Sequence, residues 1–355
     1  MKHINVVHFS TPQTCEQNWL HEEVKKYYPL TQVMFAPVYL PSLTISGTLI
    51  NKIKRLYYTL LTVKECIKKS SITDTYILWY RGHVAFFNIY CRFLRKNTNL
   101  ISFIWPVPPK KRWFSSFVQW YILSNPRHIA VINDKRAFKL YQQAFSLSHT
   151  DNFYYFPDLY DTKLPFEKNN RAPHTSDYFF TGGMNNRDFG LILQLACQNP
   201  QHRFVLVTLK EKWQFESNEI PANVQVFFNT SLSQYYGLMS KAKAVLLPLL
   251  DTRVAGLINI ARSIQAGVIC VCSRTPATEI YYDQQSQKYL VNIGNLQDLQ
   301  TAVDCISSYT PAQYQAEITC MQHFLQTNFD PKLHMKKLLD FAEDYFAKLD
   351  GECKK

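Results

Sequence analysis

A turn with two adjacent glycines and a nearby arginine is the first feature of this sequence that could do chemistry. Gly182 and Gly183 follow the apolar run YFFT, and Arg187 precedes the apolar stretch FGLILQLA. A strand, a glycine turn and a helix in this order leave backbone N–H groups unpaired at the helix start, where they attract anions. With Arg187 as counter-charge, the segment predicts a phosphate-binding turn. Asp188 is expected to cap the helix.

A second strand–loop–helix segment follows about sixty residues later. The run AVLLPLL (244–250) predicts a buried strand, the next loop holds Arg253 and Gly256, and a helix then ends at Gly267. Gly256 lets backbone approach a ligand closely. Two such units whose loops point the same way predict a nucleotide cleft at the carboxyl ends of a parallel sheet.

The elements that must position these loops alternate between strand and helix patterns along the chain, which predicts mostly parallel sheets covered by helices. In the first half, strands are expected at 4–9, 32–40, 75–80, 99–107 and 127–133, with helices at 19–28, 48–69, 84–95, 114–123 and 134–145. In the second half, strands are expected at 178–182, 203–209, 224–228, 244–249, 268–273 and 288–292. Helical patterns lie between them, and two further helices are expected after residue 310. The polar segment EKNNRAPHTS (167–176) predicts a linker.

The two glycine-containing segments resemble the donor-binding half of GT-B glycosyltransferases, in particular the large retaining family that uses nucleotide sugars (family 4-like, group 1). Gly182, Gly183 and Arg187 fit its pyrophosphate turn, and Ala266-Gly267 closes the later helix as in the family. The stretch YFPDLYDTKLPF resembles the segment that ends the family's first domain. The resemblance implies an α/β GT-B fold, with two Rossmann-like domains facing each other across a cleft.

The same resemblance divides the chain into four parts. Residues 1–166 would form an acceptor-binding domain, 167–176 the linker and 177–330 the nucleotide-sugar-binding domain. Residues 331–355 would be a terminal helix that crosses back to the first domain.

The resemblance also assigns roles to single residues. Arg187 and His83, which follows the strand TYILWY, become the catalytic candidates. The donor-binding candidates are Gly182, Gly183, Lys210, Asn229, Thr230, Arg253, Gly256, Leu257 and Arg262.

Several of these candidates have structural alternatives. Thr230 or Ser231 would equally serve as a helix cap, and Lys210 and Lys212 would equally belong to a solvated loop. Arg262 stands where the family has a ribose-binding glutamate. A cation cannot accept hydrogen bonds from hydroxyl groups, so Arg262 would contact a phosphate or a negatively charged donor, or lie on the helix face.

Composition narrows the class of protein. The 355 residues include 39 basic and 27 acidic side chains, a net charge of +12, which favours phosphates, anionic lipid surfaces or nucleic acid. Two basic, aromatic stretches, 51–61 and 108–121, suit either an anionic membrane or a core helix with a solvated face. No recognised nucleic-acid motif accompanies the charge, and no nucleic-acid partner is expected. The nine cysteines lack zinc-ligand spacing, which predicts reduced core thiols.

The functional prediction is a glycosyltransferase that moves a sugar from a nucleotide-sugar donor to a glycan or lipid-linked acceptor, in cell-surface polysaccharide or lipopolysaccharide synthesis. Retention of configuration follows from the resemblance alone. No metal or other cofactor is expected. No signal peptide or spanning helix is visible, so we expect a cytoplasmic protein that binds peripherally to the inner face of the membrane. The alternative is a catalytically silent GT-B protein that serves as a binding or scaffold subunit. Arg262, and the lack of glycines in the loop after the first strand, favour it.

Overall fold

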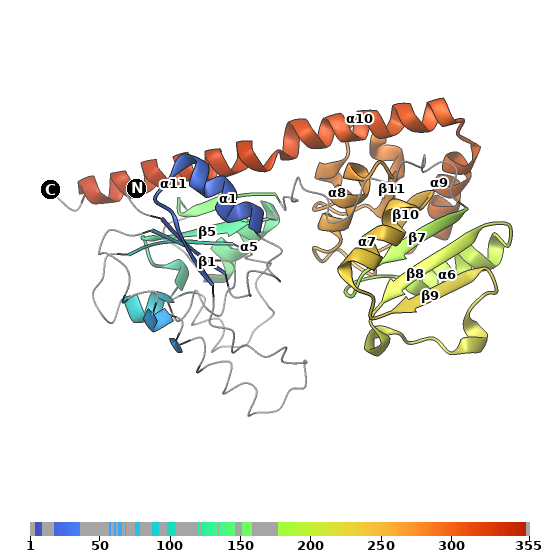
Figure 1. The fold of residues 1–355 in the computed structure, drawn as a ribbon, viewed down its shortest axis with the longest axis horizontal. Coiled ribbons are helices and arrows are strands. Elements are labelled where there is room, and N and C mark those ends of the chain that lie inside the picture. The colour runs from blue at the N-terminus through green and yellow to red at the C-terminus, as the bar shows by residue number, and fades with distance from the viewer. Residues whose placement is uncertain are drawn as a thin grey trace. The chain divides into compact units, whose positions relative to one another are not determined.

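The computed structural model describes most of the second half of the chain and selected parts of the first half. The described residues are 4–8, 18–35, 75–78, 87–91, 98–103, 122–133, 135–145, 151–157 and 177–352, with a few single residues between 57 and 68 and Trp120. The chain divides into two compact units (Figure 1). Unit 1 comprises residues 1–157 and 331–355, and unit 2 comprises residues 158–330. The expected linker, 167–176, lies outside the described residues, as do most of the helices expected at 48–69, 84–95 and 114–123.

Unit 1 contains a six-stranded parallel sheet in the order β2-β1-β3-β4-β5-β6. Its strands are β1 Ile4–His8, β2 Gln32–Phe35, β3 Thr75–Leu78, β4 Asn99–Ser102, β5 His128–Ile132 and β6 Phe153–Tyr155. The residues of β3, β4 and β5 are all buried, as expected for strands covered on both faces. No strand was expected at 153–157, whereas Phe153–Tyr155 pairs with β5 as an edge strand.

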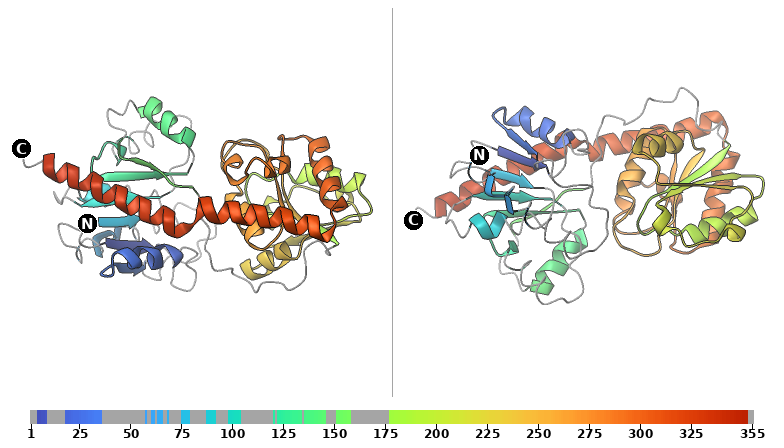
Figure 2. Two further views of the ribbon diagram at one scale, coloured as in Figure 1. Left: turned by 90° about the horizontal axis from the view of Figure 1, so that it is seen from above. Right: turned by 60° about the horizontal axis from the view of Figure 1, so that its bottom comes forward.

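Three described helices of unit 1 are α1 Asn18–Tyr27, α5 Lys135–Phe145 and α11 Pro331–Glu352. The last of these packs against the unit although it is remote in sequence (Figures 1 and 2). The Tyr28 hydroxyl donates to Glu343 at 2.7 Å, and the Tyr345 hydroxyl donates to the carbonyl of Pro126 at 2.8 Å. Arg127 pairs with Asp350 at 2.5 Å. Residues near both ends of the chain therefore contribute to one unit.

Unit 2 contains the second six-stranded parallel sheet, in the order β12-β11-β10-β7-β8-β9. Its strands are β7 Tyr178–Gly182, β8 Arg203–Thr208, β9 Val224–Phe228, β10 Ala244–Leu247, β11 Cys270–Ser273 and β12 Leu290–Val291. After β9 the chain returns to the middle of the sheet, so that β10 pairs with the other side of β7.

The helices of unit 2 begin at recognisable caps. They are α6 Phe189–Gln198, α7 Leu232–Ser240, α8 Leu257–Gln265, α9 Leu296–Ser308 and α10 Pro311–Phe329. Asp188 caps α6, as predicted, by accepting a hydrogen bond from the N–H of Leu191 at 2.9 Å. Ser231 caps α7 through the N–H of Gln234, which confirms the structural alternative for this segment. Short 3₁₀ helices occur at Lys210–Lys212, Ser217–Glu219, Glu279–Tyr281 and Ser286–Tyr289.

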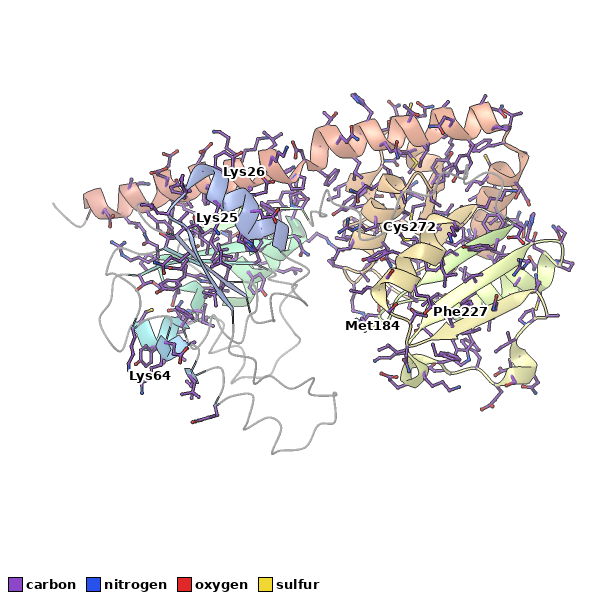
Figure 3. The ribbon with its side chains drawn as sticks, viewed as in Figure 1. Lys25, Lys26, Lys64, Met184, Phe227 and Cys272 are labelled. Atoms are coloured by element: carbon purple, nitrogen blue, oxygen red, sulfur yellow. The ribbon has the colours of Figure 1, made fainter. Side chains whose placement is uncertain are left out.

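The described cysteines are free thiols, but they do not all belong to the core. Cys91, Cys270 and Cys272 are buried, and Figure 3 shows Cys272 inside unit 2. Cys197 and Cys320 are exposed, so the prediction of core cysteines was wrong for these two, which lie on the outer faces of α6 and α10. Among the described residues, no helix combines the length and the hydropathy that crossing a membrane requires.

Candidate functional site

The sheet of unit 2 changes direction of winding between β7 and β10. Strands β8 and β9 continue from β7 on one side, whereas β10, β11 and β12 continue on the other. The loops that leave the carboxyl ends of β7 and β10 therefore diverge toward opposite sides of the sheet. Such a topological switch point is where open α/β sheets bind ligands. The two loops are the segments in which the sequence predicted a phosphate site.

Close neighbours require both glycines at the end of β7, Gly182 within the strand and Gly183 after it. A Cβ on Gly182 would lie 2.5 Å from the hydroxyl oxygen of Tyr235 and 2.6 Å from its ring. Gly183 has φ +137°, and a Cβ there would lie 2.8 Å from Nε of Arg187. The first glycine therefore admits a half-buried tyrosine ring from α7, and the second makes room for the arginine guanidinium.

Arg187 is a buried cation, only 8% exposed, at the end of this turn. Its Nε donates to the carbonyl of Gly182 at 2.9 Å, and Nη1 donates to the carbonyl of Asn185 at 3.0 Å. These carbonyls replace part of the water that the charge loses on burial. Burial raises the pKa of the neighbouring Cys270 thiol to about 11, and the charge of Arg187 acts in the opposite direction. The turn thus holds a fixed positive charge at the carboxyl edge of the sheet.

One nitrogen of this guanidinium, Nη2, packs against the glycines of both loops. A Cβ on Gly183 would lie 2.9 Å from Nη2 of Arg187, and a Cβ on Gly256 would lie 3.1 Å from the same atom. In the described part of the chain, Nη2 donates to no protein acceptor. The glycines of the two loops therefore let the guanidinium pack directly against both backbones, and Nη2 remains available to an anion that enters from the cavity.

The loop after β10 is tied to the loop after β7 by Asn186. Its Nδ2 donates to the carbonyl of Asp251 at 3.1 Å and to that of Arg253 at 3.3 Å. The Arg253 side chain is 74% exposed and pairs with Asp251 at 2.7 Å. Hydrogen bonds and charge from Arg253 lower the pKa of Asp251. The second arginine therefore lies at the surface, next to a carboxylate.

Asn259 of α8 holds the glycine turn through two hydrogen bonds. Its Nδ2 donates to the Tyr235 hydroxyl at 2.8 Å and to the carbonyl of Gly182 at 3.3 Å. The Gly182 carbonyl thus accepts hydrogen bonds from both Arg187 and Asn259. Helix α8 itself begins after Gly256, which has φ +79° and provides no side-chain cap. The N–H groups of its first turn consequently have no acceptor within the helix.

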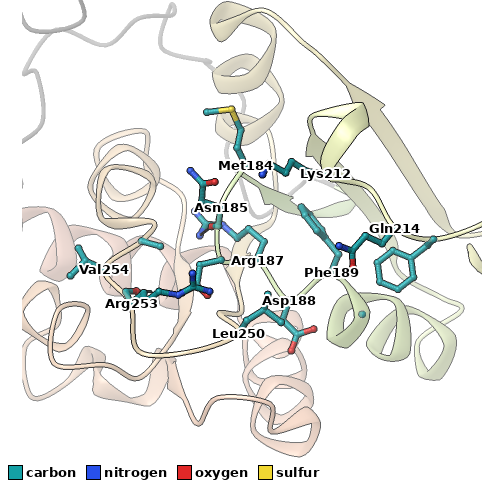
Figure 4. A pocket seen from close by; sticks show the side chains of 14 residues that line it. Met184, Asn185, Arg187, Asp188, Phe189, Lys212, Gln214, Leu250, Arg253 and Val254 are labelled. Atoms are coloured by element: carbon teal, nitrogen blue, oxygen red, sulfur yellow. Dashed lines mark hydrogen bonds between the residues drawn. The ribbon is translucent and has the colours of Figure 1, made fainter. Parts of the chain in front are cut away.

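A cavity of about 490 Å³ lies between these loops (Figure 4). Its walls come from the turn after β7, the start of α6, the loop after β10 and the segment after β8. The lining residues are Met184, Asn185, Asn186, Arg187, Asp188, Phe189, Gly190, Lys212, Gln214, Phe215, Leu250, Arg253, Val254 and Ala255. Three basic side chains and one acidic side chain line it, and the carboxylate of Asp188 already caps α6. The cavity therefore suits an anionic ligand.

Two of the predicted site residues, Arg187 and Arg253, line this cavity, and Gly183 and Gly256 contact Arg187 from either side. Lys210 lies elsewhere on the edge, with its ammonium 4.6 Å from the centre of the Phe228 ring. The Asn229 side chain accepts from the N–H of Lys210 at 3.2 Å, so it braces the backbone there. Thr230 precedes the cap of α7, and Leu257 is buried at the start of α8.

Arg262 lies one turn and a half into α8 and is 8% exposed. Its Nη1 donates to Gln265 at 3.0 Å, and its guanidinium carbon lies 5.9 Å from the centre of the Tyr236 ring. It does not belong to the cavity lining in the described part of unit 2. Of the two interpretations, these contacts favour a helix-face arginine that packs between α8 and α7.

The sequence did not single out Gln214 and Phe215, which line the cavity beside Lys212. Lys212 was considered together with Lys210, but only Lys210 was kept as a candidate. The polar residues on either side of Trp213 were the available signal for Gln214, because alternate residues of an extended segment lie on the same side. The adjacent Phe215 follows no such pattern. Tyr235 and Asn259 were also missed.

Two further predictions concern chemistry beyond this cavity, a catalytic role for His83 and transfer without a metal ion. His83 lies outside the described residues. Among the residues that the structure describes, no group of three or more His, Cys, Asp or Glu side chains could hold a metal ion.

Comparison with known proteins identifies the fold. The sequence matches no protein-family model and no curated protein. A solved glycosyltransferase from Rickettsia africae superposes with a TM-score of 0.69 at 10% identity, over 97% of this chain and 98% of that chain. HepE from Anabaena, solved with UDP and glucose, gives a TM-score of 0.69 at 13% identity, over 97% and 100%. Sucrose-phosphate synthase from Thermosynechococcus elongatus gives 0.69 at 11% identity, over 98% and 100%.

These structures share one architecture with this chain, two parallel α/β sheets in two units. The chain therefore has the GT-B fold, as predicted. At these identities the likeness concerns the fold, and the chemistry has to be argued from the site.

Proposed function

We propose that this protein is a glycosyltransferase that transfers a sugar from a nucleotide-sugar donor, with UDP as the first nucleotide to test. The observation that carries the proposal is the buried Arg187, which lines the cavity at the switch point of the second sheet and is held there by two backbone carbonyls. UDP is favoured because HepE, which has a similar fold, was solved with UDP and glucose.

The donor diphosphate would lie between the turn after β7 and the start of α8. Arg187 supplies a fixed positive charge, and the uncapped N–H groups of Leu257, Ile258 and Asn259 supply hydrogen-bond donors at the positive end of the helix dipole. Arg253 would contribute from the surface by exchanging its bond to Asp251 for one to a phosphate oxygen. Gly256 permits the close approach because no side chain intervenes.

The arrangement supports transfer by stabilising the leaving group. The bond between the anomeric carbon and the diphosphate oxygen breaks, a bond to the acceptor hydroxyl forms, and the hydroxyl proton passes to the released diphosphate. Negative charge grows on the diphosphate as the bond breaks, and a preorganised cation lowers the energy of that state. The charge of Arg187 needs no rearrangement at that moment, because its carbonyl partners already fix it.

The finer parts of the proposal are retention of configuration, a glycan or lipid-linked acceptor in cell-surface polysaccharide or lipopolysaccharide synthesis, and peripheral binding at the inner membrane face. The exposed Tyr57, Leu60 and Trp120 support membrane binding, since they are 57%, 42% and 42% exposed and occur in the two basic stretches of the sequence. Aromatic and aliphatic side chains among cations suit an anionic lipid surface.

A catalytically silent GT-B protein is the second candidate, and one observation favours it. Helix α8 carries no carboxylate, and Arg262, at the position of the family's ribose-binding glutamate, packs on Tyr236 and Gln265. A donor ribose would therefore lack that acceptor. Such a protein would bind a partner without turning over a donor.

A thermal-shift screen with UDP-, GDP-, CMP-, ADP- and TDP-linked sugars, followed by assays of nucleotide release, tests the proposal. One nucleotide class should raise the melting temperature, and Arg187→Gln should abolish both the shift and the release. Arg203→Gln is the matched control, because Arg203 pairs with Asp177 at the opposite end of β8. Binding without release would favour the silent protein, and no binding by any nucleotide would refute the donor site.

A further inference from the structure

The segment after β8 is held in place by an aromatic cluster. The ring of Trp213 lies 5.6 Å from Phe189 at the start of α6, 5.1 Å from Phe215 and 5.9 Å from Phe228 at the end of β9, each measured between ring centres. Contacts with two other parts of the unit, α6 and β9, and with Phe215 of the same segment fix the position of this segment. The backbone that carries the exposed residues Lys212 and Gln214 is therefore anchored at the carboxyl edge of the sheet.

Lys210 and Lys212, on either side of Glu211, lie in different surroundings. Lys210 packs over the Phe228 ring, whereas Lys212, on the same 3₁₀ turn, lines the cavity. Figure 4 shows the Lys212 side chain reaching toward Met184 and Asn185, on the opposite side of Arg187 from Arg253. Within the described residues, the Lys212 ammonium makes no ion pair and no hydrogen bond. The cavity therefore contains a positive charge that the protein does not neutralise.

This charge is separate from the proposed diphosphate contacts. Lys212 follows β8, whereas Arg253 follows β10, and β7 lies between these two strands. Strands two places apart in a sheet are about 10 Å from each other. One diphosphate at the start of α8 would engage Arg187 and Arg253 and leave Lys212 unpaired. Gln214 and the edge of Phe215 complete this end of the cavity, and a hydrogen-bonding amide beside an apolar ring suits a sugar.

We infer that one of the two substrates is an acidic sugar, whose carboxylate or phosphate binds Lys212 at the end of the cavity away from the donor diphosphate. The inference rests on the proposed function and makes it more specific. The acidic group belongs either to the transferred sugar or to the acceptor, and Lys212 is the residue that selects it.

Calorimetric titration of matched ligand pairs tests the inference. UDP-glucose and UDP-glucuronic acid probe an acidic donor sugar, and glucose and glucose 6-phosphate, each added with UDP present, probe an acidic acceptor. Wild type should bind the acidic member of one pair about tenfold more tightly, the size of one partly hydrated charge-assisted hydrogen bond. In Lys212→Gln that preference should fall below about twofold, with UDP affinity preserved.

Lys241→Gln is the control for the loss of one positive charge. Lys241 is exposed at the end of α7, just before β10 begins, and so lies at the opposite edge of the sheet. This variant should keep the tenfold preference. Equal binding within both pairs by wild type, or a preference that survives in Lys212→Gln, would overturn the inference while UDP binding upheld the donor site. If neither UDP nor its sugars bind, the UDP form of the proposed function fails and this inference fails with it.

Discussion

The two loops at the switch point each contribute an arginine to the same cavity, but they hold it in opposite ways. Arg187 is 8% exposed and is bonded to backbone carbonyls, whereas the Arg253 side chain is 74% exposed and paired with Asp251. Backbone carbonyls that accept hydrogen bonds from Arg187 orient the cation without neutralising its charge. A carboxylate neutralises it and must be displaced by a ligand, and an exposed pair is further weakened by water and salt. The comparison assigns the main electrostatic role to Arg187.

Replacing Arg187 should have the largest effect. Arg187→Gln removes the fixed charge and should weaken nucleotide binding about 100-fold, because charge-assisted hydrogen bonds at a buried site are lost. Arg187→Lys keeps the charge but replaces the planar guanidinium, with its fixed set of N–H donors, by an ammonium group. We expect this variant to lose about tenfold in nucleotide affinity. Titration calorimetry on both variants measures these affinities. Equal losses of affinity in Arg187→Gln and Arg187→Lys would mean that the geometry of the guanidinium, and not its charge, determines binding.

Adding a side chain at Gly182, at the end of β7, should have the next largest effect, a loss of stability. Gly182→Ala places a methyl group against Tyr235 and should destabilise the protein by about 2 kcal/mol. For a unit of this size the melting temperature should fall by about 4–8 °C. Gly237→Ala is the matched control, because Gly237 lies in α7 with nothing within 4 Å of its added Cβ. Alanine favours helix there and should stabilise by about 0.5–1 kcal/mol. A fall of similar size in both variants would show that the clash is not the cause.

Removing the Asn259 side chain, which is hydrogen-bonded to the glycine turn, should have a smaller effect on stability. Asn259→Ala loses the hydrogen bonds to Gly182 and Tyr235 and should cost about 1–2 kcal/mol. The Gly182 carbonyl keeps its bond from Arg187, so nucleotide affinity should fall less than in Arg187→Lys. Chemical denaturation and calorimetry measure the two effects. A loss of affinity as large as that of Arg187→Gln would show that Asn259 touches the ligand directly.

The exposed arginine should matter least. Arg253→Gln should lower nucleotide affinity about threefold at low ionic strength, with the difference shrinking at high salt as the surface charge is screened. The melting temperature should stay unchanged, since the pair with Asp251 lies in solvent. Binding measured at two salt concentrations tests this. A salt-independent loss larger than that of Arg187→Lys would reverse the ranking of the two loops.

Much of the fold could be predicted from sequence patterns. The run VQVFF was predicted as a strand and is β9, Val224–Phe228, and Asp188 was predicted as a helix cap and is one. The alternation of buried runs with helical spacing follows from the hydrophobic burial that parallel sheets demand. The short edge strand Phe153–Tyr155 was missed, because three half-buried aromatic residues before a proline resemble the entry to a turn.

The candidate site was only partly predictable. Arg187 and Arg253 were predicted and line the cavity, because each lies in the loop between a clear strand pattern and a helix pattern. Lys212 was passed over in favour of Lys210, and sequence alone offers no reason to separate two lysines on one turn. Asn259 and Gly182 are 77 residues apart, and their hydrogen bond depends on how α8 packs against the end of β7.

The sequence by itself determined that two glycine-containing loops would leave parallel strands and that each would carry an arginine, because local apolar patterns and turn residues are enough to specify such units. Tertiary structure decided what each basic side chain faces. Arg187 is bonded to carbonyls because its own turn folds back under it, and Arg253 is paired because Asp251 is close. Lys212 faces the cavity because Trp213 anchors the segment on Phe189 of α6 and Phe228 of β9, two separate parts of the unit. Contacts between distant segments orient these charges, and no local pattern encodes them.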